Sequence, residues 1–298
     1  MVSLFCRHNR LTANCPICSR ELEAELKAKA PPRPASVRKA PAGRARRGGS
    51  GSPARRGGVV TRRLARAEDD GYRNQLVPGL RATADAERLG AALLEAHARL
   101  EPPGPHDAVA TEPDGGQATW LAFLLTLAGP ALEDAVAAAA PRWEDGVPED
   151  LPEPQRRAAE AYRQWAERAG SQEAAFTGEA DWSPARRFAR VLERLALPGF
   201  TRAQRFDLLA VLAAAGLYEL EADTLALGVD GDATSQAAKR ALLSGDRMLL
   251  ERRARDLARA TGVPLAAVDR GLAWWDDPAV ELEPPEEWPA AMRSALAL

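Results

Sequence analysis

Apolar residues recur at helical spacing through most of the chain. Between residues 186 and 275 they form at least four blocks, which begin at Phe188, Phe206, Ala237 and Leu250. Earlier ranges with helical spacing or a buried-helix pattern are 85–100, 119–127, 131–140 and 155–168. This repeated periodicity predicts an all-α fold.

The breaks between these blocks carry residues that end or begin helices. Pro198-Gly199 ends one helix, and the hydroxyl of Thr201 is suited to cap the next. Another helix is expected to begin at Ala222–Thr224, and Pro264 fits the first turn of a last helix that carries two tryptophans. Glycines expected to end helices are Gly216, Gly228 and Gly231.

The composition favours the same fold class. Alanine, arginine and leucine dominate the 298 residues, while β-branched and aromatic residues are few. No run approaches the ~20 apolar residues that a membrane-spanning helix needs, so we expect no membrane partner. Residues 1–10 have no apolar core after their first charges, so we expect no secretory signal and a cytoplasmic location.

The charge is divided unevenly along the chain. Residues 27–66 hold 13 basic residues and no acidic one, which leaves 27 basic and 42 acidic residues elsewhere, a net charge of −15. An acidic domain does not attract DNA by bulk charge. Contact with nucleic acid must therefore be local, or must come from the basic segment.

The first 26 residues contain a metal-ligand pattern. Cys6-x-His8 is followed after six residues by Cys15-x-x-Cys18, and these four side chains match a tetrahedral structural Zn²⁺ site. A disulfide would leave one of the three cysteines unpaired, and a redox Cys-x-x-Cys usually opens a helix in a βαβ unit. We therefore predict a zinc knuckle over residues 1–26, with the metal supplying its folding free energy.

The next segment, residues 27–67, is rich in proline, glycine, serine and arginine. With almost nothing to bury, it is predicted to be a disordered linker. Its arginine clusters suit a tether to DNA or RNA, and the alternative is a solvated spacer. Residues 68–298 are predicted to form an all-helical domain.

Leu197–Arg202 reads as a turn between two helices, the layout of a helix-hairpin-helix. A glycine in such a turn lets backbone N–H groups approach a phosphate, and the following helix adds a favourable dipole. The segment resembles the helix-hairpin-helix DNA glycosylase superfamily, in which a Leu-Pro-Gly turn precedes a carboxylate. Here Asp223 follows Gly199 by 24 residues, and Thr201 stands where a second glycine is usual.

This resemblance implies that a carboxylate acts on a nucleotide flipped out of DNA. We assign that role to Asp223, and to Lys239 a phosphate contact or a reactive amine. The alternatives are an N-cap for Asp223 and a solvated helix face for Lys239 and Arg240. The residues expected to contact DNA are Gly199, Thr201, Arg202, Arg205, Arg240, Arg186 and Arg187.

A narrower resemblance covers the knuckle and the helical domain. The stretches FCRHNRLTANCPICS and AAKRALLSGDRMLLERRARDLA, with Trp274 and Trp275, look like the bacterial α-glutamyl/putrescinyl thymine pyrophosphorylase clade 3 family. The resemblance implies displacement of pyrophosphate from a pyrophosphorylated hydroxymethyl-pyrimidine in DNA by an amine such as putrescine or glutamate. An acidic site would attract a polyamine, and arginines would hold the pyrophosphate.

Two other functions remain open at this point. One is a base-excision DNA glycosylase, which would release a free base. The other is a non-catalytic adaptor that binds DNA or protein, favoured by the acidic domain and by Thr201 in place of the second glycine. No phosphate loop, His-Glu-x-x-His motif or dinucleotide fingerprint is found in the sequence.

Overall fold

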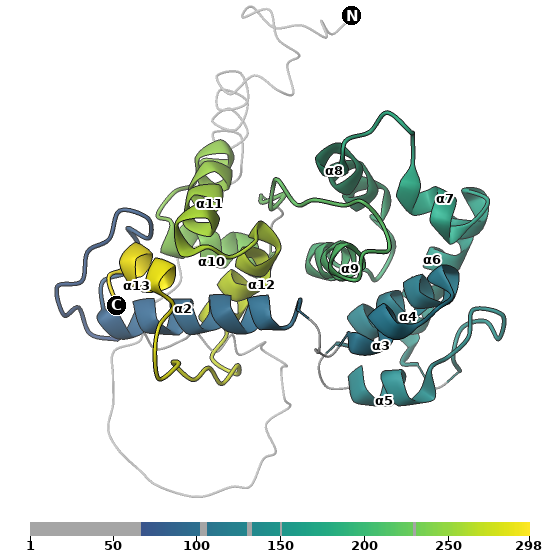
Figure 1. Cartoon of the computed structure of the whole chain (residues 1–298), viewed down its shortest axis with the longest axis horizontal. Helices are drawn as coiled ribbons and strands as arrows, with labels where there is room; N and C mark the ends of the chain where they lie inside the picture. The colour runs from purple at the N-terminus through teal and green to yellow at the C-terminus, as the bar shows by residue number, and fades with distance from the viewer. Residues whose placement is uncertain (1–66, 102–105, 130–132, 150, 229–230) are drawn as a thin grey trace, which may run out of the picture. The chain divides into compact units, whose positions relative to one another are not determined.

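The computed structural model describes residues 67–101, 106–129, 133–149, 151–228 and 231–298, which belong to the unit Val60–Leu298. The described residues form helices and no strand, so the all-α prediction is confirmed for this part of the chain (Figure 1). The predicted zinc knuckle and all of the predicted linker except Ala67 lie outside the described residues. No helix found among the described residues is long and apolar enough to span a membrane.

The helices are α2 (Thr83–Ala98), α3 (Asp107–Thr111), α4 (Gly115–Ala128), α5 (Glu133–Ala139), α6 (Glu153–Arg168), α7 (Gln172–Thr177), α8 (Pro184–Arg194), α9 (Arg202–Ala214), α10 (Ala233–Ala241), α11 (Arg247–Thr261), α12 (Leu265–Asp276) and α13 (Ala290–Leu296). Each predicted apolar block lies within or overlaps one of them. Helical periodicity therefore located most of these elements, with small errors at their ends.

Several predicted boundaries between α9 and the C-terminus are wrong. No helix begins at Ala222–Thr224, because residues 219–228 form an irregular loop before α10. Gly228 and Gly231 therefore lie between α9 and α10 and end no helix. Pro264 is the N-cap of α12 rather than part of its first turn, and α13 follows α12.

Side-chain caps explain where several helices begin. Ser183 accepts a hydrogen bond from the N–H of Arg186 at the start of α8. Thr201 begins α9 with a capping box, in which its hydroxyl accepts from Gln204 N while its own N–H donates to the Gln204 side chain. These caps fix the turn between α8 and α9.

Aromatic side chains form the core around α4. Trp120 and Phe123 are fully buried. The Phe123 ring stacks on Tyr162 of α6 with centroids 4.0 Å apart, and Phe200 of the α8–α9 turn lies 5.1 Å from Phe123. These contacts hold the turn against α4 and α6.

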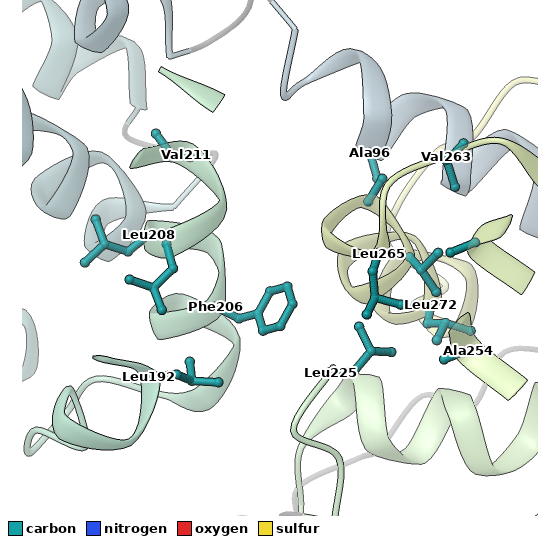
Figure 2. Close-up of a cluster of buried hydrophobic side chains, with 14 of the residues drawn as sticks. Ala96, Leu192, Phe206, Leu208, Val211, Leu225, Ala254, Val263, Leu265 and Leu272 are labelled. Carbon is teal, nitrogen blue, oxygen red and sulfur yellow. The ribbon is translucent and has the colours of Figure 1, made fainter. Parts of the chain in front are cut away.

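The C-terminal helices gather around α12, which packs closely on α2. Gly271 permits this approach, because a Cβ atom there would lie 2.8 Å from a methyl carbon of Leu93. Apolar side chains of α9 and α12, among them Phe206 and Leu272, are buried in one cluster (Figure 2). Leu225 of the α9–α10 loop belongs to the same cluster.

Candidate functional site

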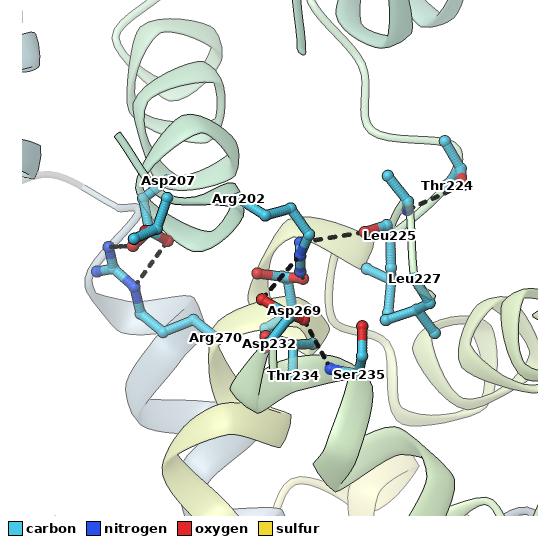
Figure 3. Close-up of polar contacts among 12 residues, drawn as sticks. Arg202, Asp207, Thr224, Leu225, Leu227, Asp232, Thr234, Ser235, Asp269 and Arg270 are labelled. Carbon is cyan, nitrogen blue, oxygen red and sulfur yellow. Dashed lines mark hydrogen bonds and ion pairs between the residues drawn. The ribbon is translucent and has the colours of Figure 1, made fainter. Parts of the chain in front are cut away.

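Arg202, the first residue of α9, is buried between two carboxylates (Figure 3). Its Nη1 donates to Oδ1 of Asp269 on α12 at 2.8 Å, and its Nε lies 3.1 Å from Oδ1 of Asp232. Nη1 also donates to the carbonyl of Leu225 at 3.1 Å. One guanidinium thus joins α9, α12, the start of α10 and the loop between α9 and α10.

Arg270, the next residue of α12, forms a second ion pair with α9 (Figure 3). Its Nε donates to Oδ1 of Asp207 at 3.1 Å, and its Nη2 lies 2.9 Å from Oδ2, so the pair is bidentate. The guanidinium carbon lies 5.4 Å from the ring centroid of Trp274. Nη1 of Arg270 is buried with no hydrogen-bond partner among the described residues. We call Arg202, Asp207, Asp232, Asp269 and Arg270 the α9–α12 ion cluster.

A pocket of about 160 Å³ lies beside the ion cluster. Its polar lining includes Glu133, Asp207, Thr234, Asp269 and Arg270. Its apolar lining includes Leu125, Ala203, Ala273 and Trp274. The pocket therefore presents both charged and apolar side chains to a bound molecule.

Burial raises the pKa of Asp269 to about 7, and the nearby carboxylates of Asp207 and Asp232 add to the rise while Arg202 opposes it. Burial lowers the pKa of Arg202, but the attraction of Asp269 and Asp232 outweighs it, so Arg202 stays charged. With every group ionised, the three carboxylates of the cluster exceed its two guanidiniums by one negative charge. A proton on Asp269 removes this excess.

Asp269 retains capacity for a further hydrogen bond. Both hydrogen bonds from Arg202 go to its Oδ1. No hydrogen bond to its Oδ2 is found among the residues that the structure describes, and Asp269 lines the pocket. Its second oxygen can therefore hold a proton or accept one from a bound molecule.

A buried histidine, His106, lies close to Glu133 of the pocket lining. Nη2 of Arg99 lies 2.6 Å from Oε2 of Glu133, and Nε2 of His106 lies 3.9 Å from Oε1. Burial lowers the pKa of His106 to about 4, and the charges of Arg270 and Arg99 lower it further. His106 is therefore neutral at pH 7, and neither ring nitrogen has a hydrogen-bond partner within the described ranges.

The α9–α10 loop reaches the cluster because Glu251 of α11 holds it. Its buried carboxylate accepts from the N–H groups of Leu225 and Leu227 at 2.8 and 2.7 Å, and from the hydroxyl of Thr224 at 2.9 Å. These bonds replace the helical hydrogen bonds that a helix from Ala222 would have made. They also fix the carbonyl of Leu225 that Arg202 contacts.

The predicted catalytic residues lie outside this pocket. Asp223 is exposed in the α9–α10 loop, and Lys239 is exposed on α10. No hydrogen bond or ion pair links Asp223 to Lys239 in the part of the chain that the structure describes, and neither side chain lines the pocket. The carboxylates that the fold brings behind the Leu197–Arg202 turn are instead Asp232 and Asp269.

Two of the arginines predicted to contact DNA are buried and bonded to protein. Arg202 belongs to the ion cluster, and Arg187 donates to the carbonyls of Thr177, Trp182 and Glu219. Since their guanidiniums already have internal acceptors, both side chains cross-link the fold in this structure.

The predicted phosphate-binding turn has an internal explanation as well. Gly199 has a φ of +77°, and a Cβ atom there would lie 2.9 Å from the carbonyl oxygen of Pro154 on α6. Thr201 is exposed, but its hydroxyl serves the capping box of α9. The glycine is thus required by packing against α6.

The other predicted DNA contacts are more accessible. Arg186 is exposed, and its Nη1 lies 3.9 Å from Asp181. Arg205 is half-buried and donates to the carbonyl of Leu192. Arg240 is half-buried, with Nη1 2.5 Å from Oδ1 of Asp276. Of these three, Arg186 is the freest to meet a phosphate.

The predicted zinc ligands, Cys6, His8, Cys15 and Cys18, lie outside the described residues. Within the described residues, no group of three or more histidine, cysteine, aspartate or glutamate side chains is arranged to hold a metal ion.

Comparison with protein-family models, with curated proteins and with solved structures found no match.

Proposed function

We propose that the helical unit modifies a pyrimidine base in DNA, with an amine displacing pyrophosphate from a pyrophosphorylated hydroxymethyl group. The proposal combines the sequence resemblance to the thymine pyrophosphorylase family with the pocket beside the α9–α12 ion cluster. The observation that carries it is Asp269, a buried pocket carboxyl with a pKa of about 7. Such a group is close to half-ionised at neutral pH, which suits it to accept a proton.

The pocket residues take the following roles in this reaction. The carboxylate of Asp269 accepts a proton from the ammonium group of the incoming amine. The free nitrogen then attacks the exocyclic methylene carbon of the base, a C–N bond forms, and the C–O bond breaks. Pyrophosphate leaves with the bonding electron pair, and the unpaired Nη1 of Arg270 is available to one of its oxygens.

In this proposal, Asp269 takes the role that spacing along the chain assigned to Asp223. The two aspartates differ in the property that the reaction needs. Asp269 is buried in a small pocket, whereas Asp223 is surrounded by solvent. Only a carboxylate shielded from water approaches the basicity required to take a proton from an ammonium group.

The test is incubation of the full-length protein with DNA carrying the pyrophosphorylated base, with putrescine or glutamate, followed by nucleoside mass spectrometry. An amine adduct with release of pyrophosphate supports the proposal. A released free base would indicate a glycosylase. Neither product, despite tight DNA binding, would indicate a non-catalytic adaptor.

Matched variants test the site. Asp269→Asn should lower the rate of adduct formation by ~10²-fold or more, the usual contribution of a positioned proton acceptor. Asp223→Asn should leave the rate unchanged. The reverse pattern would place the chemistry on the α9–α10 loop and refute the role of the pocket.

A non-catalytic adaptor is the second candidate, and one observation favours it. The carboxylates and guanidiniums of the ion cluster already pair with one another across α9, α10 and α12. A network of this kind is sufficient to fix the helices without taking part in catalysis. In that case Asp269→Asn would change stability without changing any product.

A further inference from the structure

The exposed face of α11 carries a row of arginines. Arg252, Arg255 and Arg259 are all exposed and follow one another by three and four residues, so they share one side of the helix. Met248 precedes them at the same spacing and is 73% exposed. The opposite side of α11 is apolar and buried, which leaves this row facing solvent.

The three arginines of the row have only one carboxylate partner among the described residues. Asp256 lies 3.1 Å from Arg259 and 3.9 Å from Arg252 and partly offsets their charge. Arg255 forms no ion pair with any described residue and donates only to a carbonyl of its own helix. The row lies on a chain whose residues outside 27–66 have a net charge of −15. The face is therefore a local positive patch on an acidic unit.

Two exposed apolar residues, Leu243 just before α11 and Met248 in its first turn, form what we call the apolar tip. Leu243 is 58% exposed and has a φ of +49°, a conformation that is unfavourable for leucine. Arg253 donates to the carbonyls of Leu242 and Leu243, on both sides of this residue. The backbone is thus held in place while the Leu243 side chain stays in solvent, as Met248 does.

We propose that this face of α11 binds the DNA backbone, with the arginine row on phosphates and with Leu243 and Met248 against the bases. The inference rests on the proposed function to the extent that DNA is the substrate. It adds a surface that the predicted DNA contacts did not include. Apolar side chains beside phosphate-binding arginines are the groups that unstack base steps, and chemistry on a base requires the nucleotide to leave the stack.

The dimensions and the chemistry favour DNA over a lipid surface. From Met248 to Arg259 the row extends ~16 Å along the helix, and B-DNA carries one negative charge per ~1.7 Å of its axis. A helix that lies in a membrane interface needs a continuous exposed apolar face. Here the apolar face of α11, with Leu250 and Leu257, is buried in the core.

The test compares two triple variants of the full-length protein by fluorescence anisotropy with duplex DNA over a range of salt concentrations. The first is Arg252→Gln/Arg255→Gln/Arg259→Gln. The control, Arg156→Gln/Arg157→Gln/Arg168→Gln on α6, removes the same charge elsewhere. Both retain residues 27–66, so any contribution from that segment cancels.

We expect the α11 variant to lose at least ~10-fold in affinity and to reduce the slope of log K against log salt by about 2 to 3, while the control changes little. Equal behaviour of the two variants would overturn the proposal. So would a loss confined to binding of anionic lipid vesicles, with DNA affinity unchanged.

The apolar tip has its own measurement. A duplex with 2-aminopurine should brighten on binding wild-type protein, and Leu243→Ala/Met248→Ala should reduce that increase while retaining most of the affinity. No brightening with wild type would refute the role of the tip. If wild-type protein binds DNA through α11 but transfers no amine, the proposed chemistry is refuted and the proposed DNA-binding face is still supported.

Discussion

Replacing Asp269 with asparagine should remove a pH-dependent part of the stability of the helical unit. The pKa of Asp269 rises from its ordinary value of 3.8 to about 7 in the folded protein, chiefly because the carboxyl is buried. Each pKa unit corresponds to about 1.4 kcal/mol, so ionising this group costs the folded state about 4 kcal/mol. Because Asp269 is fully buried, solvent does not reduce this value appreciably.

The sign follows from which state holds the proton. Below about pH 4 the carboxyl is protonated in both the folded and the unfolded chain, and its full contribution to stability is present. As the pH rises towards 7, the unfolded chain releases the proton first, so stability falls by about 1.4 kcal/mol per pH unit. Above the folded pKa both states are ionised and the curve levels off.

The assay is urea unfolding of wild type and Asp269→Asn at pH values from about 4.5 to about 8.5. The free energy of unfolding of wild type minus that of the variant should fall by about 3 kcal/mol over this range. Asp223→Asn is the control, because it makes the same substitution at an exposed aspartate outside the ion cluster. A flat difference for Asp269→Asn would show that burial does not govern this carboxyl.

Gly199→Ala should lower the free energy of unfolding by about 1–3 kcal/mol, because its Cβ would meet the Pro154 carbonyl. Gly216→Ala is the control, since Gly216 has a similar φ but no atom within 4 Å of a Cβ, and it should lower the free energy of urea or thermal unfolding by less. Equal losses would mean that only φ matters. Glu251→Gln should lower the free energy of unfolding by about 1–3 kcal/mol and speed amide hydrogen exchange at Leu225 and Leu227, because it removes one of two carboxylate acceptors. Unchanged exchange at these two residues would contradict the anchoring of the loop by Glu251. Metal analysis under reducing conditions should find zinc in wild type and none in Cys15→Ser, and a metal-free wild type would end the knuckle hypothesis.

Periodicity predicted the helices because burial of one face imposes its spacing on the sequence. The helix expected at Ala222–Thr224 is absent because its backbone N–H groups find a better acceptor in Glu251, a residue that local pattern does not connect with them. The N-caps at Ser183 and Thr201 were predictable because capping is a local interaction. The loop was not, because its geometry depends on a distant side chain.

The candidate site was harder to predict from sequence. Arg202 follows a predicted helix cap and reads as an exposed cation, yet the fold buries it against Asp269 and Asp232. Spacing from the Leu-Pro-Gly turn led to Asp223, but spacing along the chain does not indicate which carboxylate the fold buries. An acidic and a basic residue at adjacent positions of an otherwise apolar helix, as at Asp269-Arg270, was the one available signal.

Asp232 divides its carboxylate between two tasks, and this limits how the position can evolve. One oxygen accepts the N–H of Ser235 and starts α10, while the other faces Arg202. Asparagine would retain the cap but lose the charge, and the longer glutamate is a poor helix cap. Divergent relatives should therefore change positions 202, 232 and 269 together, or change none of them.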